Sequence, residues 1–515
     1  MRRLLVWSCL VIAGNAFAAD AQPRYQPTWD SIDSRPTPSW WSDAKFGIFI
    51  HWGVYSVPAF APRGEYAEWY WERIGKPGDP DPASRDARLR QEARDFHARV
   101  HGRDFPYFDF APQFRAEMFD PDQWAALFRR SGAKYVVLVS KHHDGFALWP
   151  SPQANASWGR RWNAVDEGPH RDLVGELAAA VRRQDLEMGF YFSLYEWFNP
   201  LWVSRQYETY VRQHMFPQFK DLVTRYSPSI IFADGEWELS SAQWHAPELL
   251  AWLFNESPVA DKVVINDRWG QETRHLHGGY YTTEYGAGLP GATHPWEENR
   301  GIGHSYGFNR NENLGDYASG PRLLLTLIDT VSRGGNLLLN VGPTADGRIP
   351  VVMQERLAYL GQWLAANGEA IYGTRTFRGG AQWTAGRRQE LDTSTNYRAK
   401  YDVEALTLHP APGDARKEIL FTRKGSTLYA ILPRYPQYIL TIRQLQLPKN
   451  ACVSLLGSRH AGIAWRQMGD DVVITMPAIA DGELPFEGPR TLRIENAIRT
   501  DTDAAPSGSS PSATR

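Results

Sequence analysis

Short apolar segments of β-forming residues alternate with helical patterns between residues 39 and 372. The clearest are 46–50, 135–139, 188–192, 230–233, 263–265 and 336–341. Most are apolar throughout, as strands must be when both faces of a parallel sheet are covered. The alternation predicts consecutive βα units, and a chain of 515 residues has room for one large barrel and a smaller module.

Polar residues follow several of these segments at the point where each segment ends. Examples are 51–53 (HWG), 141–144 (KHHD), 234–237 (DGEW) and 266–269 (NDRW). In a (β/α)8 barrel the carboxyl ends of the strands meet at one face, which holds the active site. A doubly wound open sheet is the competing architecture, but it favours a glycine-rich phosphate loop after the first strand, and 49–53 (FIHWG) is not one. The pattern therefore predicts an α/β fold with a (β/α)8-like barrel over residues 30–373.

Beyond residue 377 the pattern changes to β-type segments separated by Gly, Pro and Asp. Segments 418–421, 427–432 and 471–476 are the clearest, and they predict a C-terminal antiparallel β-sandwich over residues 377–496. Residues 500–515 are rich in Ser, Thr, Pro and Ala without apolar periodicity, which predicts a disordered tail.

The first 18 residues have the pattern of a signal peptide. Two arginines at positions 2 and 3 precede an apolar stretch at 4–13, and 16–18 (AFA) matches the small residues before a cleavage site. We expect an exported protein, with the periplasm favoured over a secreted or lysosome-like location. The apolar stretch is too short for a stable membrane anchor, and no membrane partner is expected.

The charge balance argues against a polyanionic partner. Lys and Arg total 56 and Asp and Glu total 58, so the net charge is −2 and gives no reason to expect nucleic acid or an anionic membrane. The 21 Trp and 23 Tyr provide flat apolar faces with a polar edge, against which a sugar ring can lie. We expect a neutral ligand; the sequence does not predict an oligomeric state.

Two acidic residues are candidates for catalysis. Asp234 directly follows the apolar segment 230–233, although a helix cap is an equally good interpretation of that position. Glu297 follows Trp296, whose ring could desolvate the carboxyl group and raise its pKa, as a general acid needs; a solvated loop glutamate is the alternative. Glycoside hydrolysis requires two carboxyl groups, about 5–5.5 Å apart in a retaining enzyme.

The histidines suggest a rival class of enzyme, the metal-dependent barrel hydrolases. His51, His142 and His143 could form a metal site, and 275–277 (HLH) places two rings on one face of a strand. Such hydrolases, however, usually have a His-x-His pair on the first strand, where this chain has 50–52 (IHW). Neutral histidines can instead bind the hydroxyl groups of an uncharged substrate, so we expect no metal and no other cofactor.

Several longer segments occur in an order typical of one enzyme family. They are 40–41 (WW), 45–53 (KFGIFIHWG), 68–70 (EWY), 141–146 (KHHDGF), 234–237 (DGEW), 264–270 (VINDRWG), 335–343 (GNLLLNVGP) and 367–372 (NGEAIY). From about residue 30 to residue 495 the chain resembles the alpha-L-fucosidases of glycoside hydrolase family 29. The resemblance implies a catalytic (β/α)8-like barrel followed by a β-sandwich. It also implies a retaining exo-glycosidase that removes terminal alpha-L-fucosyl residues from oligosaccharides or glycoconjugates through a fucosyl-enzyme intermediate.

The resemblance also assigns roles to individual residues. It implies that Asp234 is the nucleophile and Glu297 the acid/base; Glu298 is an alternative, because Asn299 stands where animal relatives have a Cys shortly after the Trp-Glu pair. Phe232 replaces a Trp that is frequent in relatives. The sugar-contacting positions of the family correspond to His51, Glu68, Trp69, His142, His143, Tyr191 and Arg268.

A third functional class remains open beside the fucosidase and the metal-dependent hydrolase. A carbohydrate-binding protein could keep the barrel without hydrolysing its ligand, although the presence of both carboxylates argues against it. The sequence does not predict which fucosyl linkage or leaving group is preferred.

Overall fold

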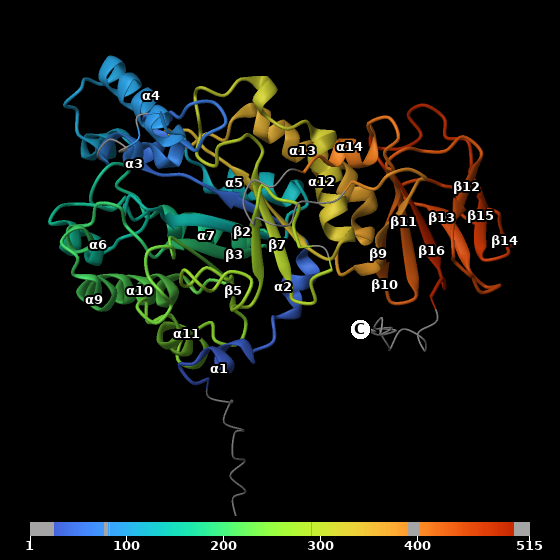
Figure 1. Ribbon diagram of the computed structural model, residues 1–515, viewed down its shortest axis with the longest axis horizontal. Coiled ribbons are helices and arrows are strands. Elements are labelled where there is room, and N and C mark those ends of the chain that lie inside the picture. Colours follow the sequence, from blue (N-terminus) through green and yellow to red (C-terminus); the bar gives the residue numbers. More distant parts are fainter. Residues whose placement is uncertain (1–24, 77–80, 82, 290, 390–400, 499–515) are drawn as a thin grey trace, which may run out of the picture.

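The computed structural model describes residues 25–76, 81, 83–289, 291–389 and 401–498. The predicted signal peptide and the predicted C-terminal tail lie outside these residues. Figure 1 shows a helix-covered body that contains the N-terminal and central parts of the chain, and beside it a β-rich body formed by the C-terminal strands.

Parallel strands form the centre of the first body. Within the described residues they are β1 (Phe46–Ile50), β2 (Tyr135–Lys141), β3 (Glu187–Ser193), β4 (Ile230–Asp234), β5 (Val264–Ile265), β6 (Tyr281–Glu284), β7 (Trp296–Gly301) and β8 (Asn336–Val341). Their order is β5-β4-β3-β2-β1-β8-β7-β6, with parallel pairing throughout. Between the two end strands, the Ile265 carbonyl accepts hydrogen bonds from the N–H groups of Gly279 and Tyr280, which directly precede β6. The sheet therefore curves round into a barrel.

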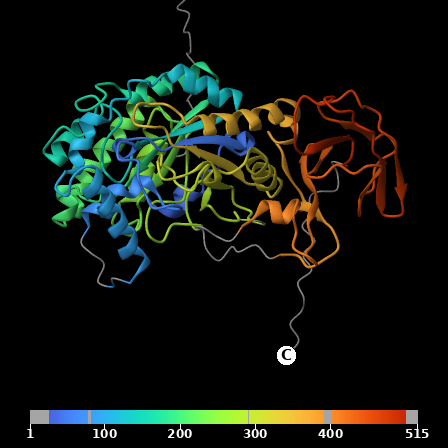
Figure 2. The same ribbon diagram turned by 90° about the horizontal axis from the view of Figure 1, so that it is seen from above.

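Helices surround this barrel (Figure 2). They are α1 (Trp29–Asp33), α2 (Ser39–Ala44), α3 (Tyr70–Gly75), α4 (Arg85–Val100), α5 (Pro121–Arg130), α6 (Pro152–Trp158), α7 (Leu173–Arg183), α8 (Pro200–Val203), α9 (Tyr207–Thr209), α10 (Phe216–Tyr226), α11 (Ala246–Asn255), α12 (Gly320–Ser332) and α13 (Val351–Asn367). In the described part of the chain, no helix is both long enough and apolar enough to span a bilayer.

Helix α5 illustrates how the sequence determines these elements. The Asp120 carboxylate accepts hydrogen bonds from the first free N–H groups of the helix, and Pro121 suits the first helical position because it has no N–H to satisfy. Trp124, Leu127 and Phe128 are buried and lie on one face of the helix, at the three- and four-residue spacing of an amphipathic helix. The helix therefore packs this apolar face against the barrel.

Side chains of the barrel strands alternate between the inside of the barrel and the layer beneath the helices. On β1, Phe49 belongs to the inner cluster, whereas Ile48 and Ile50 belong to the core between sheet and helices. The inner cluster is largely aromatic and contains Trp41, Phe49, Tyr66, Tyr135, Tyr191, Phe232, Tyr280 and Tyr306 with several aliphatic residues. Successive inward residues of one strand are about 6.6–6.8 Å apart, so the interior consists of stacked layers.

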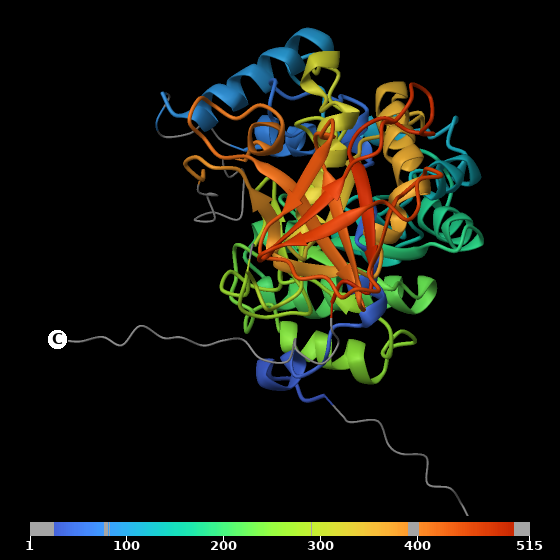
Figure 3. The same ribbon diagram turned by 90° about the vertical axis from the view of Figure 1, so that its right-hand side faces the viewer.

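The second body is an antiparallel β-sandwich with its own apolar core (Figure 3). Its strands are β9 (Arg375–Trp383), β10 (Lys417–Lys424), β11 (Thr427–Leu432), β12 (Ile439–Ile442), β13 (Cys452–Leu455), β14 (Trp465–Met468), β15 (Asp471–Thr475) and β16 (Arg490–Glu495), with the short helix α14 (Val403–Thr407) before β10. One sheet has the order β13-β16-β11-β10-β9 and the other the order β12-β15-β14. The predicted fold class, a (β/α)8-like barrel followed by a β-sandwich, is confirmed.

The two strands that the sequence pattern did not predict are β6 and β7. The apolar segments correspond to β1, β2, β3, β4, β5 and β8, but β6 (YTTE) and β7 (WEENRG) are mostly polar. Both are nevertheless buried along nearly their whole length. Polar side chains are tolerated there because they form hydrogen bonds, such as that between the Asn299 amide and the Thr283 carbonyl at 2.8 Å.

A buried charged cluster joins α12 to the sandwich. The Asp329 carboxylate accepts hydrogen bonds from Arg333 Nε at 2.8 Å and from the Tyr401 hydroxyl at 2.6 Å, and it pairs with Lys417 of β10. Asp329 and Lys417 are almost completely buried. The charges compensate one another inside the protein, where an unpaired charge would be costly.

We therefore expect Asp329→Ala to destabilise the protein strongly, because it leaves two buried cations without their partner. The expected loss is about 3–5 kcal/mol, seen as a lower midpoint in thermal or urea unfolding. As a control, Asp122→Ala removes an exposed pair with Arg183 and should cost no more than about 1 kcal/mol. Equal losses for the two variants would contradict this account of the cluster.

Candidate active site

The carboxyl ends of the barrel strands surround a cavity of about 620 Å³. It is lined at its base by residues of the strand ends, namely Phe49, His51, His142, Tyr191, Phe232, Asp234, Arg268, Glu284, Asn299 and Tyr306. The segment 65–90 and the loops after β4 and β5 supply further lining residues. The predicted position of the site, at the carboxyl ends of the strands, agrees with this geometry.

Asp234 is the last residue of β4 and lies two residues beyond Phe232, so both face the barrel interior. Its Oδ1 accepts a hydrogen bond from Arg268 Nη1 at 2.9 Å, and its Oδ2 accepts one from the Tyr191 hydroxyl at 2.9 Å. His143 Nε2 lies 3.5 Å from Oδ2. Burial opposes ionisation of Asp234, but Arg268 and His143 outweigh it and hold the pKa of Asp234 well below its usual range. The carboxylate is therefore ionised and fixed in orientation.

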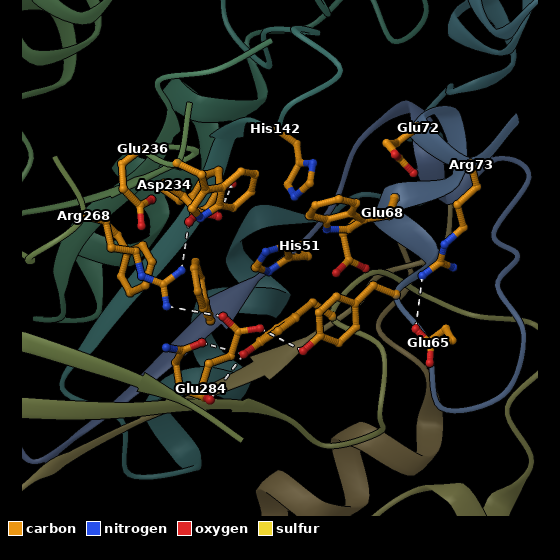
Figure 4. Close-up of a pocket in the computed structure, with 18 of the residues that line it drawn as sticks. His51, Glu65, Glu68, Glu72, Arg73, His142, Asp234, Glu236, Arg268 and Glu284 are labelled. Atoms are coloured by element: carbon orange, nitrogen blue, oxygen red, sulfur yellow. Dashed lines mark hydrogen bonds and ion pairs between the residues drawn. The ribbon is translucent and has the colours of Figure 1, made fainter. Parts of the chain in front are cut away.

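Arg268 joins Asp234 to a second carboxylate. Its Nη2 lies 3.3 Å from Oε2 of Glu284, the last residue of β6, and its Nε donates to the Thr282 hydroxyl at 3.0 Å. The Tyr66 hydroxyl donates to Glu284 Oε1 at 2.8 Å. Figure 4 shows the Arg268 side chain between those of Asp234 and Glu284. One planar guanidinium group thus sets the separation of the two carboxylates.

The histidines of the cavity are neutral at physiological pH. Burial lowers the pKa of His51 to about 3, and its Nδ1 is 2.7 Å from Oδ1 of Asn340. Burial, together with the neighbouring His143 and His51, lowers the pKa of His142 well below its usual value. Within the described residues, Nδ1 of His142 has no hydrogen-bond partner. A neutral imidazole with an unused nitrogen is a suitable partner for a hydroxyl group.

Glu68 and Trp69 form another part of the cavity wall, in the 3₁₀ turn at Ala67–Trp69. Glu68 Oε2 accepts a hydrogen bond from the Gly307 N–H at 2.8 Å, and burial raises the pKa of Glu68 to about 7. The Trp69 ring lies 5.8 Å from the Trp237 ring, centroid to centroid. All seven predicted sugar contacts therefore lie in or directly behind the cavity: six line it, and His143 contacts Asp234 from behind.

Glu297, the predicted acid/base, does not line the cavity. It faces the barrel interior near the start of β7, where it is paired in register with Asn336, the first residue of β8. Its Oε2 accepts a hydrogen bond from the Tyr135 hydroxyl, and burial raises its pKa to about 8. The next inward residue, Asn299, does line the cavity. Glu297 therefore lies one layer below the cavity floor, about 6.6–6.8 Å further down the strand.

Glu298, the alternative acid/base, faces the opposite side of β7. Its Oε1 accepts hydrogen bonds from the Gly286 N–H at 2.9 Å and from Arg300 Nη2 at 2.6 Å, and its Oε2 accepts one from the Thr283 hydroxyl. It is not among the cavity-lining residues either. The structure thus brings the predicted nucleophile to the cavity but neither of the predicted proton donors.

The histidines considered for a metal site fall into two groups in the structure. The His142 ring lies 5.8 Å from the His51 ring and 4.3 Å from the His143 ring, whereas His275 and His277 have separate partners. His275 Nε2 lies 2.9 Å from the Thr282 carbonyl oxygen, whereas His277 Nδ1 lies 2.7 Å from Asp33. Across the described ranges, no three His, Cys, Asp or Glu side chains form a group that could hold a metal ion.

Glu284 and Glu236 are among the cavity-lining carboxylates to which the sequence analysis assigned no role. Glu236 follows Asp234 on the same loop; its Oε1 accepts a hydrogen bond from Arg274 Nε at 2.6 Å, and burial raises its pKa. The available signal for Glu284 was the alternation of inward residues at Tyr280, Thr282 and Glu284, at the two-residue period of a strand. That signal was weak because the segment has only four strand residues, three of them polar.

An ionised carboxylate that faces a second carboxylate across a cavity at the mouth of a barrel is the arrangement used by glycoside hydrolases. The surrounding neutral imidazoles and aromatic rings suit a sugar rather than a charged ligand. Fold and site together therefore define this class of enzyme.

Comparisons with known proteins identify the family. The model of the family described as alpha-L-fucosidase matches residues 12–369. The alpha-L-fucosidase of Branchiostoma floridae is 39% identical over 501 residues, which cover 95% of this chain and 100% of that protein. The tissue alpha-L-fucosidase of Homo sapiens is 39% identical over 487 residues, which cover 92% of this chain and 93% of that protein. The chain also superposes on a crystal structure of Thermotoga maritima alpha-fucosidase in complex with a mechanism-based inhibitor, with a TM-score of 0.69 and 33% sequence identity. The match covers 92% of this chain and 100% of the Thermotoga chain. The chain belongs to the alpha-L-fucosidase family and is a glycoside hydrolase.

The buried position of Glu297 leads to a prediction for Glu297→Gln. Because the raised pKa keeps Glu297 protonated at neutral pH, a glutamine of the same shape can replace it. We expect kcat to change by less than about tenfold, which corresponds to about 1.4 kcal/mol in the barrier. A loss of several orders of magnitude, with the fold intact by circular dichroism, would contradict this placement.

The same variant tests the pKa of Glu297 through stability. Its folded-state pKa is about 8 against a usual 4.5, so the folded protein holds a proton that the unfolded chain has released between these values. The protonated Glu297 makes its full contribution to the free energy of unfolding below about pH 4.5, and this contribution is lost as the pH rises towards 8. Between pH 5 and 8, the unfolding midpoint of Glu297→Gln should therefore fall less than that of the parent. Parallel pH profiles would show that Glu297 does not titrate in this way.

Proposed function

We propose that the protein hydrolyses terminal alpha-L-fucosyl residues of glycans or glycoconjugates with retention of configuration. Membership of the alpha-L-fucosidase family supports the sugar and the reaction class. The observation that supports the mechanism is the contact of one guanidinium group, that of Arg268, with both Asp234 and Glu284.

In the first step, Asp234 attacks the anomeric carbon while Glu284 protonates the departing glycosidic oxygen. The C–O bond to the leaving group breaks, and an ester between the fucosyl group and Asp234 forms. In the second step, Glu284 takes a proton from water, and the resulting hydroxide equivalent replaces Asp234 at the same carbon. Two inversions return the original configuration, and both carboxyl groups regain their starting protonation states.

The shared arginine supports retention rather than inversion. Retaining enzymes have carboxyl groups about 5–5.5 Å apart, whereas inverting enzymes need about 6.5–9.5 Å to admit a water molecule between the carboxylate and the sugar. The two terminal nitrogens of Arg268 lie 2.9 Å from Asp234 and 3.3 Å from Glu284, and this shared partner supports the shorter separation in the proposal. The same cation keeps Asp234 ionised, as attack on the sugar requires.

We assign the role of proton donor to Glu284 rather than to Glu297 because of where the two side chains lie relative to the cavity. A general acid must come within hydrogen-bond reach of the oxygen that it protonates. Glu284 lines the cavity, whereas Glu297 lies in the layer beneath it.

The remaining cavity residues bind the fucosyl group in this proposal. Neutral His51 and His142 hydrogen-bond ring hydroxyls, and the carboxyl group of Glu68 offers a further partner. The Trp69 ring packs against the apolar edge of the sugar, including its C6 methyl group. His143 and Tyr191 hold the second oxygen of Asp234.

We also propose that the protein is exported, with the periplasm as the favoured compartment. The support is the signal-peptide pattern of residues 1–18. Mass spectrometry of the natural protein should find an N-terminal peptide that begins at Ala19, in an extracytoplasmic fraction. A cytoplasmic protein that retains its first 18 residues would contradict export.

The nucleophile is tested by Asp234→Gly, with an aryl alpha-L-fucoside as substrate. We expect kcat to fall by at least about 10³-fold, because no group remains to form the ester intermediate, and azide to restore part of the turnover in its place. For the parent enzyme, proton NMR of the first product should show the alpha anomer of fucose.

Four results would contradict the proposal. An initial beta anomer would indicate inversion, and near-normal turnover by Asp234→Gly would exclude this nucleophile. Loss of parent activity on treatment with a chelator would favour the metal-dependent hydrolase instead. Tight fucose binding without turnover of any fucoside would identify a carbohydrate-binding protein.

The proton donor is tested by comparing Glu284→Gln with Glu297→Gln. For substrates with a poor leaving group, Glu284→Gln should lower kcat by about 10²–10⁴-fold, and fucosyl fluoride, whose leaving group needs little protonation, should be affected much less. Glu297→Gln should show no such dependence on the leaving group. The reverse pattern would restore Glu297 as the acid/base and remove Glu284 from the mechanism.

A further inference from the structure

We propose that Glu298 is a positioning residue that fixes the backbone on both sides of Glu284. The proposal rests on the proposed role of Glu284 as proton donor. Glu298 itself faces away from the cavity and does not contact the sugar site, so its effect on catalysis is exerted through β6.

Glu298 contacts residues on both sides of Glu284 in the sequence. Its Oε2 accepts a hydrogen bond from the hydroxyl of Thr283, the residue before Glu284, and Thr283 is also its register partner across the β6–β7 ladder. Its Oε1 accepts a hydrogen bond at 2.9 Å from the N–H of Gly286, two residues after Glu284. One carboxylate therefore holds the chain immediately before and immediately after the proposed acid.

Arg300 completes this arrangement. Its Nε and Nη2 lie 3.1 Å and 2.6 Å from Glu298 Oε1, and Nη2 also donates to the Gly286 carbonyl at 2.9 Å. Both backbone polar groups of Gly286 are thus bound, the N–H by Glu298 and the carbonyl by Arg300. Glu298 is only 2% exposed, so these contacts are shielded from water and strengthened by the low local dielectric.

Strand β6 requires such support because of its place in the sheet. It has four residues, it is the last strand in the ladder order, and β7 is its ladder neighbour. Glu284 is its final residue, directly before a loop. A side chain at the end of a short terminal strand has few backbone contacts of its own. The Glu298 contacts hold the backbone on either side of Glu284, and they add to the side-chain contacts of Arg268 and Tyr66 that keep the Glu284 carboxyl group in place.

The expected effect of losing these contacts is a displaced proton donor rather than a lost sugar site. A misplacement of about 1 Å can lower the rate by about 10²-fold. The residues that bind the sugar come mainly from other strands, so KM should change little. The loss should be greatest for substrates whose leaving group must be protonated.

The experiment compares Glu298→Ala and Glu298→Gln across aryl alpha-L-fucosides with leaving groups of different pKa. Glu298→Ala should lower kcat by about 10–100-fold for the poorest leaving groups and much less for the best ones, with a nearly constant KM. Glu298→Gln keeps one acceptor oxygen and should restore part of the activity, and it also serves if the alanine variant does not fold. In a Glu284→Ala background, Glu298→Ala should have no further effect on kcat.

A matched control is Asp172→Asn. The Asp172 carboxylate also accepts hydrogen bonds from a glycine N–H, that of Gly175, and from a hydroxyl, that of Tyr226, but it caps α7 and does not line the cavity. This variant should lower the unfolding midpoint without changing the dependence of kcat on the leaving group. The control therefore distinguishes the effect of a less stable protein from the effect of a displaced Glu284 carboxyl group.

The outcomes distinguish this proposal from the proposed function. Equal losses for good and poor leaving groups in Glu298→Ala, or an additive loss in the Glu284→Ala background, would overturn the positioning role of Glu298 and leave the mechanism standing. If Glu284→Gln itself shows no dependence on the leaving group, the assignment of the acid fails, and the positioning role fails with it.

Discussion

A single buried guanidinium group, that of Arg268, organises the active site. It contacts the nucleophile Asp234 with one terminal nitrogen and Glu284 with the other. Burial disfavours the ionised form of Asp234, and the neighbouring cation offsets this effect. In the proposed mechanism, the separation of these two carboxyl groups decides between retention and inversion. The ionised state of Asp234 and the placement of both proposed catalytic groups thus involve one side chain.

The barrel supplies this position through the alternation of its strands. Inward residues form layers, and the inward polar residues at the strand ends form the uppermost layer, which lines the cavity together with Phe49 and Phe232. Asp234 and Glu284 are the last residues of β4 and β6, so both belong to that layer. Glu297 stands near the start of β7 and belongs to a lower one. Glu284 and Glu297 therefore differ in their access to the cavity because they differ in height along their strands.

The sequence predicted the fold class because that class depends on strong local signals, and it placed Asp234 at the end of a strand that borders the cavity. Strands that are covered on both faces must be apolar, so six of the barrel strands were recognisable, and the polar residues after them indicated the site. Strands β6 and β7 were missed because their buried polar residues are stabilised by tertiary hydrogen bonds, which a local pattern does not reveal. Because β6 and β7 were not predicted as strands, the sequence did not show which way the side chains of Glu284 and Glu297 face. The position of Glu297 below the cavity is defined by the register of β7 against β8, which a local pattern does not reveal.

The most direct test of the account is to trap the covalent intermediate and locate it. Incubation with a 2-deoxy-2-fluoro-fucosyl fluoride, which forms the ester quickly and hydrolyses it slowly, should label one residue per protein molecule. Proteolysis and mass spectrometry should place the label on Asp234. A label on another residue, or continued turnover without any labelled intermediate, would contradict the central claim that Asp234, held by Arg268 opposite Glu284, is the nucleophile.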